Sequence, residues 1–118
     1  MTPEQLRART KKFTVDVIRF AKTEIPANRI DDAISGQLTS AASSGAAAYR
    51  ACCRARSRAD FIYKLGNAIE EVDEAAFWLE VLMESGAVAR DAAGRLWKEA
   101  DELTRILVRS QETARRNR

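Results

Sequence analysis

The sequence predicts an all-α fold, an antiparallel up-down-up-down four-helix bundle that forms one domain over residues 1–118. Four long segments carry apolar residues at alternating spacings of three and four, which is the pattern of helices facing a shared core. No segment shows the strict alternation of a half-buried strand. The chain also holds only 5 Gly and 2 Pro, too few for the frequent turns of a sandwich or barrel.

The first helix is expected over residues 3–24. Thr2 is the predicted N-cap, Pro3 takes the first helical position, and Gln5 stands where a capping box needs it. The helix should end at Ile25, because a residue before proline avoids helical geometry. Its predicted core positions are Leu6, Thr10, Phe13, Val17 and Phe20.

The second helix is expected over about residues 28–55, with small residues filling positions 41–48. Gly45 in that run costs about 1 kcal/mol of helix stability relative to alanine. We therefore expect a neighbouring helix to approach closely there, although an alanine-rich run could also serve only to favour helix. The predicted core positions are Ile30, Ile34, Leu38, Ala41 or Ala42, Gly45, Ala48 and Cys52.

The third helix is expected to begin at Ser57, which precedes Asp60 by three residues in the manner of a capping box. A kink within one long helix is the alternative at this position. The helix should stop at Ser85, with Gly86 in the position after the cap. Its predicted core positions are Phe61, Leu65, Ala68, Val72, Ala75 or Ala76, Leu79 and Leu82.

The fourth helix is expected over about residues 91–113, with Asp91 as its N-cap. Residues 114–118, of which three are Arg, should form a frayed basic tail. The predicted core positions of this helix are Leu96, Ala100, Leu103, Leu107, Ser110 and Ala114.

The composition disfavours an enzyme. The chain has no His, so it lacks the usual zinc ligand and the usual general base. It also lacks the histidine that activates the nucleophile in Ser-His-Asp and Cys-His catalytic sites. The acidic run 70–74 lies on one helix, so it lacks the partners of a carboxylate metal site, and we expect no metal and no cofactor. The adjacent Cys52 and Cys53 suit reduced thiols and a cytoplasmic location, and no segment predicts a signal peptide or a membrane span.

Basic residues form two groups that could contact RNA or DNA. Net charge is +3 from 20 basic and 17 acidic residues, so a polyanionic partner is permitted. One group contains Arg50, Arg54 and Arg58, which share a helix face if the helix continues that far, with Arg56 to one side. These arginines could instead pair with the acidic third helix, or remain solvated. The second group, near the start of the first helix, comprises Arg7, Arg9, Lys11 and Lys12.

Bulky apolar residues exceed what the core of one slim bundle can cover. The consecutive Phe77, Trp78 and Leu79 span about 200° of a helix, so Phe77 or Trp78 must face outward or sideways. The same reasoning applies to Trp97, which follows Leu96, and to Ile106, which lies in a run of three aliphatic residues: one core cannot cover all of these side chains. Surplus apolar surface of this kind is typical of subunit interfaces, so we expect self-association. A wider core and a small-molecule pocket are the alternatives.

The central part of the chain resembles a known family. The residues that carry this resemblance are Gln37–Leu38, the small run 41–51, the segment 57–61 and the segment 70–79, in the same order and spacing. The chain is similar to the bacterial 23S rRNA intervening-sequence proteins over nearly its whole length. The family usually has Asn where this chain has Ala48, and often a Glu shortly after the tyrosine, where this chain reads Arg50-Ala51-Cys52.

The resemblance implies a four-helix bundle that assembles as a ring-like homopentamer. Some members are encoded inside intervening sequences of ribosomal RNA genes. A related branch, the accessory proteins of diversity-generating retroelements, binds nucleic acid and a reverse transcriptase. We expect a non-enzymatic bundle that self-associates and binds nucleic acid or nucleoprotein, with a protein-binding scaffold as the alternative. Arginines in an open position would favour the first function, and arginines paired with third-helix acids the second.

Overall fold

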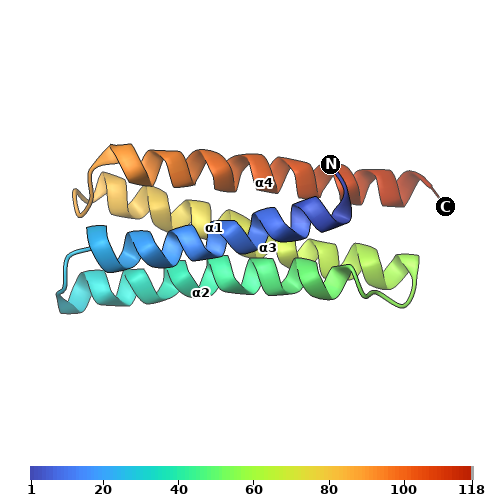
Figure 1. Ribbon diagram of the computed structural model, residues 1–118, viewed down its shortest axis with the longest axis horizontal. Coiled ribbons are helices and arrows are strands. Elements are labelled where there is room, and N and C mark those ends of the chain that lie inside the picture. The colour runs from blue at the N-terminus through green and yellow to red at the C-terminus, as the bar shows by residue number, and fades with distance from the viewer. Residues whose placement is uncertain (118) are drawn as a thin grey trace.

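Four long helices lie side by side in the computed structural model, which describes residues 1–117 (Figure 1). They are α1 (Pro3–Glu24), α2 (Arg29–Cys52), α3 (Arg58–Glu84) and α4 (Arg90–Arg116). Each helix runs opposite to the one before it, and together they form a rod of 48 × 20 × 20 Å. The predicted antiparallel four-helix bundle is confirmed.

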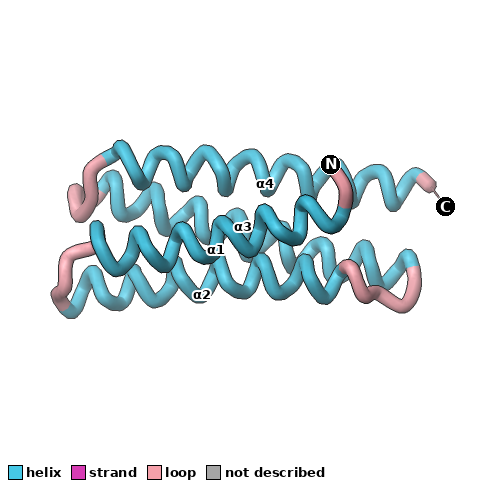
Figure 2. Tube along the Cα trace, viewed as in Figure 1, coloured by secondary structure: helices cyan, strands magenta, loops and turns pink. Residues whose placement is uncertain are grey.

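The helices form a closed ring of neighbours around one core. Within the described residues, α1 packs on α2 and α4, α3 packs on α2 and α4, and α1 does not pack on α3. The helices α1 and α3 are therefore diagonal partners. Figure 2 shows the α1–α2 and α3–α4 loops at one end of the rod, and the α2–α3 loop at the other end with both termini.

Side-chain caps begin the first three helices. The backbone N–H of Gln5 donates to Thr2 Oγ1 at 3.1 Å, and the Thr2 N–H donates to Gln5 Oε1 at 2.9 Å, which confirms the predicted capping box. The Asn28 side chain accepts from the N–H of Asp31 at 2.9 Å. Ser57 Oγ accepts from the N–H of Asp60 at 3.1 Å, so α3 is a separate helix and not the continuation of α2.

Two predicted helix ends are wrong. The helix α2 ends at Cys52 and not at residue 55, because the chain must turn through 53–56 before the extended backbone of Ser57 can cap α3. The helix α4 begins at Arg90, its N-cap is Ala89, and no side chain caps it. Asp91 therefore lies in the first turn, where its charge can still favour the helix dipole.

The end of α3 matches its prediction, and the end of α4 does not. Gly86 has a φ of +80°, a left-handed conformation that glycine adopts without strain, and it terminates α3 as predicted. The helix α4 continues to Arg116, three residues beyond the predicted end at 113, so the predicted frayed tail is wrong for residues 114–116. Residue 118 of that tail lies outside the described residues. None of the helices in residues 1–117 combines the length and hydropathy needed to cross a membrane.

The core contains most of the predicted positions. In α1 all five are buried, and in α3 all are buried except Phe61, which is half-buried. In α2 the prediction fails at Ile30, which is 73% exposed because the first turn lies at the end of the bundle, beyond the cover of its neighbours. Tyr49 is buried where Ala48 was expected. In α4, Leu96, Ser110 and Ala114 are half-buried at the edge of the core.

The small run of α2 lets the neighbouring helices approach closely. A Cβ atom added at Gly45 would lie 2.8 Å from Val72 Cγ2 and 3.3 Å from the Val72 backbone nitrogen. On the other side, the Thr14 hydroxyl of α1 donates to the Ala42 carbonyl at 3.0 Å. The predicted close approach is confirmed, and it brings both α1 and α3 against α2.

Candidate nucleic-acid interface

Basic and acidic side chains are separated along the rod. If each helix is divided at its middle, the half with the α2–α3 loop comprises residues 1–13, 41–70 and 104–117 (Figure 1). This basic half carries 13 basic and 4 acidic side chains, a formal charge of +9. The acidic half, residues 14–40 and 71–103, carries 6 basic and 13 acidic side chains, a formal charge of −7. The net charge of the chain is modest, but the charge is strongly separated between the two ends of the rod.

The four arginines of the first predicted group gather at the end of the basic half. Arg50 lies on α2, Arg54 and Arg56 lie in the turn and loop after it, and Arg58 is the first residue of α3. The condition for a shared helix face is not met, because α2 ends at Cys52, so Arg50, Arg54 and Arg58 do not form a ladder on one helix. All four side chains are exposed, and none has an acidic partner within 4.0 Å among residues 1–117.

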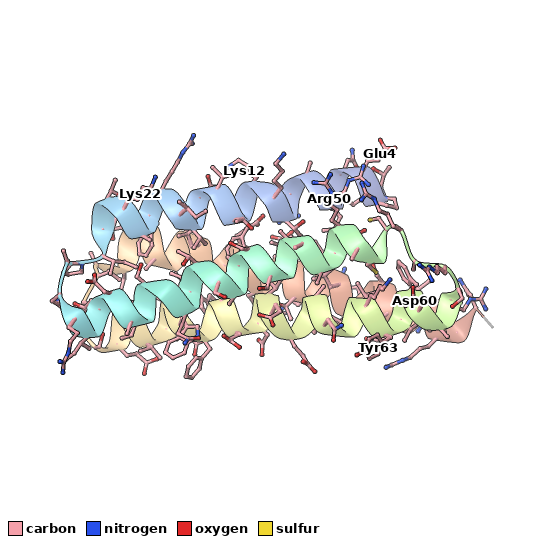
Figure 3. The ribbon with its side chains drawn as sticks, turned by 90° about the horizontal axis from the view of Figure 1, so that it is seen from below. Glu4, Lys12, Lys22, Arg50, Asp60 and Tyr63 are labelled. Carbon is pink, nitrogen blue, oxygen red and sulfur yellow. The ribbon has the colours of Figure 1, made fainter. Side chains whose placement is uncertain are left out.

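The second predicted group is divided by the fold. Arg7 and Lys11 line a shallow hollow of about 540 Å³ together with Arg50, whose side chain lies beside the first turns of α1 near Glu4 (Figure 3). Lys12 does not line this hollow and pairs with Asp16 at 2.7 Å. The structure therefore joins Arg7 and Lys11 to the first arginine group and leaves Lys12 apart.

Arg9 forms an ion pair between two helices and is not free to contact a ligand. Its Nε and Nη2 atoms donate to the two carboxylate oxygens of Glu99, each at 2.7 Å, and Nη2 also lies 3.2 Å from Glu102. The hydrogen bond with Glu99 raises the pKa of Arg9 above its ordinary value. This bidentate pair joins α1 to α4 and removes Arg9 from the available basic surface.

Further basic residues join this end from α4 and from the start of α3. Arg109 lines a hollow with Met1, Phe61 and Ser110, so the C-terminal part of α4 lies against the N-terminus. Arg115 and Arg116 continue beyond it on the last turn. Lys64 is paired with Asp60 at 2.9 Å, and its hydrogen bond lowers the pKa of that carboxyl. Sequence reasoning did not single out Arg109, although the antiparallel topology alone places it at this end.

An apolar hollow of about 510 Å³ opens at the same end. Its lining includes Leu6, Tyr49, Phe61 and Ile106, with Arg58 at one side. Ile106, a predicted interface residue, is half-buried there and does not face fully outward.

Two ionisable groups at this hollow are held neutral. Burial, together with the charge of Cys53, raises the pKa of the Cys52 thiol to about 11. Burial also raises the pKa of Tyr49. Both groups therefore remain protonated at neutral pH.

Of the three aromatic residues predicted to lie at a subunit interface, one is exposed and two are half-buried and hydrogen-bonded. Phe77 is 52% exposed, whereas Trp78 and Trp97 are half-buried. The indole N–H of Trp97 donates to Glu80 at 2.8 Å, and that of Trp78 donates to Glu74 at 3.3 Å. Phe77 is therefore the member of the Phe77–Trp78–Leu79 run that faces outward.

The acidic run of α3 lies beside these aromatics. Glu70, Asp73 and Glu74 are exposed, while burial and two like-charged neighbours raise the pKa of the half-buried Glu71. Within residues 1–117, no group of three or more carboxylate or thiol side chains is placed to hold a metal ion. This run does not pair with the arginines of the same molecule in the described residues.

Comparison with known proteins places the chain in a family. It is similar to the solved structure of a protein of unknown function from the S23 ribosomal protein family of Bacteroides thetaiotaomicron. The TM-score is 0.82 at 24% identity, over 95% of this chain and 99% of that one, a likeness that supports the fold. No curated protein matches. Residues 5–109 match the 23S rRNA-intervening sequence proteins, and the chain therefore belongs to this family.

Proposed function

We propose that this protein assembles with copies of itself and binds nucleic acid, RNA or DNA, through its basic half, without catalysing a reaction. Five copies is the number that the family resemblance implies. The observation that carries the proposal is the separation of charge into a half of +9 and a half of −7. A polyanion responds to this local field and not to the net charge of +3.

The chemistry of the basic end suits phosphate. Arg50, Arg54, Arg56 and Arg58 are exposed, and each guanidinium is available to form paired hydrogen bonds with phosphate oxygens. Phosphate contacts release condensed counterions, so binding should be strongest at low salt and fall steeply as salt is added. Arginines in an open position, rather than in pairs with α3 acids, favour a nucleic-acid partner over a protein scaffold.

The test compares two triple variants that remove the same charge from opposite halves. Arg54→Gln/Arg56→Gln/Arg58→Gln removes three charges from the basic half, and Arg29→Gln/Arg90→Gln/Arg95→Gln removes three from the acidic half. Fluorescence anisotropy with labelled RNA and DNA, titrated with salt, measures affinity and its salt dependence.

We expect the first variant to bind about tenfold or more weakly and to lose about two to three units of the log–log salt slope. The control variant should change affinity by less than about threefold. Absence of binding at low salt, or equal losses in the two variants, would contradict the proposal.

A protein-binding scaffold is the second candidate function. The exposed Phe77 beside the acidic run of α3 supports it, because an aromatic residue with a charged rim is typical of a protein interface. An assembled protein that binds neither RNA nor DNA at low salt would favour the scaffold.

A further inference from the structure

Two outward-facing rows of residues remain unused by the bundle. The α1 row is Lys11, Val15, Ile18 and Lys22, in which Val15 is 38% and Ile18 37% exposed. The α3 row is Glu74, Phe77, Val81 and Glu84, in which Phe77 is 52% exposed and Val81 is half-buried. Each row places two apolar residues between two charged ones, and the charges of the two rows are opposite.

The two rows lie on opposite sides of the molecule. The helices α1 and α3 are diagonal partners, so their outward faces point away from each other. Figure 3 shows Lys12 and Lys22 along the α1 edge of the rod and Tyr63 along the opposite, α3 edge. The α1 row therefore cannot reach the α3 row of its own chain, but it can reach that of a second copy.

The two rows also lie at the same level along the rod. The Thr14 hydroxyl bonds to the Ala42 carbonyl, which sets Thr14 level with Ala42. Gly45, which packs on Val72, is three residues nearer the α2–α3 end than Ala42. Because α1 and α2 are antiparallel, Lys11 is level with Gly45 and therefore with Val72.

The helices α1 and α3 run in the same direction, so this correspondence extends along both rows. Val15 then lies close to the level of Phe77, and Lys22 close to that of Glu84. A rotation about an axis parallel to the rod leaves the level of every residue unchanged. Copies related by such a rotation would bring each lysine of one row opposite a glutamate of the other.

We propose that the α1 row of one copy packs against the α3 row of the next copy, with the rods parallel. This inference rests on the self-association proposed above and assigns its contact surface. The expected pairs are Lys11 with Glu74, Val15 with Phe77, Ile18 with Val81, and Lys22 with Glu84. Pairing of either row with itself would instead bring like charges together, which disfavours association.

Such a contact uses different faces on the two partners, so it repeats from copy to copy. It forms a closed ring if each copy is rotated relative to the last by a fraction of a full turn, and an open row if it is not. Parallel rods place every basic half on the same face of the assembly. The exposed arginines of several copies would then form one extended basic surface. Multivalent contact with a single strand would strengthen nucleic-acid binding beyond the affinity of one copy.

Charge reversal tests the pairing. The single variants Lys11→Glu and Glu74→Lys, the double variant Lys11→Glu/Glu74→Lys and the control Lys98→Glu all alter exposed side chains. Size-exclusion chromatography with light scattering measures the mass of each, and circular dichroism checks that each variant is folded. We expect both single variants to weaken association by about tenfold or more, and the double variant and the control to keep the parental mass.

A second double variant distinguishes the direction of the rods. Antiparallel rods would pair Lys11 with Glu84, so Lys11→Glu/Glu84→Lys would then restore assembly instead. Rescue by that variant, or single variants that retain the parental mass, would overturn the proposed contact while leaving self-association intact. A parent protein that is monomeric at every concentration would overturn the self-association itself, whatever its affinity for RNA or DNA.

Discussion

At the residue scale, Gly45 determines how closely α2 and α3 can pack. Its neighbours are the side chain and the backbone of Val72, a buried β-branched residue with little rotamer freedom. Gly36 lies in the same helix and is exposed, and a Cβ added there would have no atom within 4 Å apart from its own residue, its chain neighbours and the backbone of its own helix. Substitutions at these two glycines therefore distinguish the effect of intrinsic helix propensity from the effect of packing between helices.

We predict opposite effects of alanine at these two positions. Gly36→Ala should raise the free energy of unfolding by about 0.5–1 kcal/mol through helix propensity. Gly45→Ala gains the same propensity but should lower stability by about 1 kcal/mol or more, because the new methyl group forces Val72 and α3 to move. Chemical denaturation of the two variants checks this, and equal stabilisation by both would contradict the close approach.

The Cys52 thiol gives the fold a dependence on alkaline pH. Burial raises its pKa from 9.0 to about 11. As pH rises from 9 to 11, the unfolded chain releases this proton first, so the folded state loses stability relative to it. We predict a loss of about 1–2 kcal/mol over this interval that is specific to Cys52.

The measurement is the free energy of unfolding at pH 8 and at pH 11. The loss between these values should be smaller in Cys52→Ala than in the parent, although Cys52→Ala will itself be less stable at pH 8 because it leaves a cavity. The variant Cys53→Ala, at a half-buried position, is the control and should retain most of the parental loss, because burial is the larger cause of the raised pKa of Cys52 and the charge of Cys53 is the smaller one. An identical pH dependence in all three proteins would show that Cys52 is not held protonated.

At the scale of the helix, side-chain caps determine where α1, α2 and α3 begin. The start of α4 has no such cap: Ala89 occupies the N-cap position, and its methyl group cannot accept a hydrogen bond from the first turn. The first turn of α4 is therefore less stabilised than those of the other three helices.

We predict that Ala89→Asp will stabilise the protein by about 0.5–1.5 kcal/mol, because its carboxylate can accept from the backbone N–H groups of that turn and interact favourably with the helix dipole. Thermal unfolding measures the gain. Ala89→Leu, which adds a side chain but no acceptor, is the control and should give no gain. An unchanged melting temperature in Ala89→Asp would place the helix start elsewhere.

The sequence was sufficient to predict the helices whose ends have a local chemical signal. Thr2 with Gln5, Ser57 with Asp60, and Gly86 each specify a boundary through atoms within three or four residues. The end of α2 depends on where the chain must turn to pack α3, which is a tertiary requirement with no local signal. Because α2 ends earlier than predicted, Arg50, Arg54 and Arg58 do not share one helix face. They nevertheless lie at the same end of the rod.

At the scale of the whole molecule, the antiparallel topology converts five consecutive blocks of sequence, three basic and two acidic, into two charged ends. The start of α1, the α2–α3 loop and the end of α4 are far apart in the chain, yet they meet at the basic end. The individual basic groups could be predicted from sequence. Their exposure and their separation from the acidic half required the packing of the four helices.

The packing of four helices around one core also explains why the chain exposes apolar residues on opposite sides of the rod. The buried core takes one face of each helix, which leaves Val15 and Ile18 on α1 and Phe77 on α3 at the surface. These residues lie beside charges of opposite sign on the two helices, an arrangement that favours contact between different faces of neighbouring copies.

The proposed function requires an assembly of this protein whose basic face binds nucleic acid. Light scattering after size-exclusion chromatography, with and without a short RNA at low salt, tests it most directly. We predict a particle whose mass is a multiple of 13.2 kDa, close to five copies, and which gains the mass of bound RNA. A particle of 13.2 kDa that is unchanged by RNA would contradict the claim.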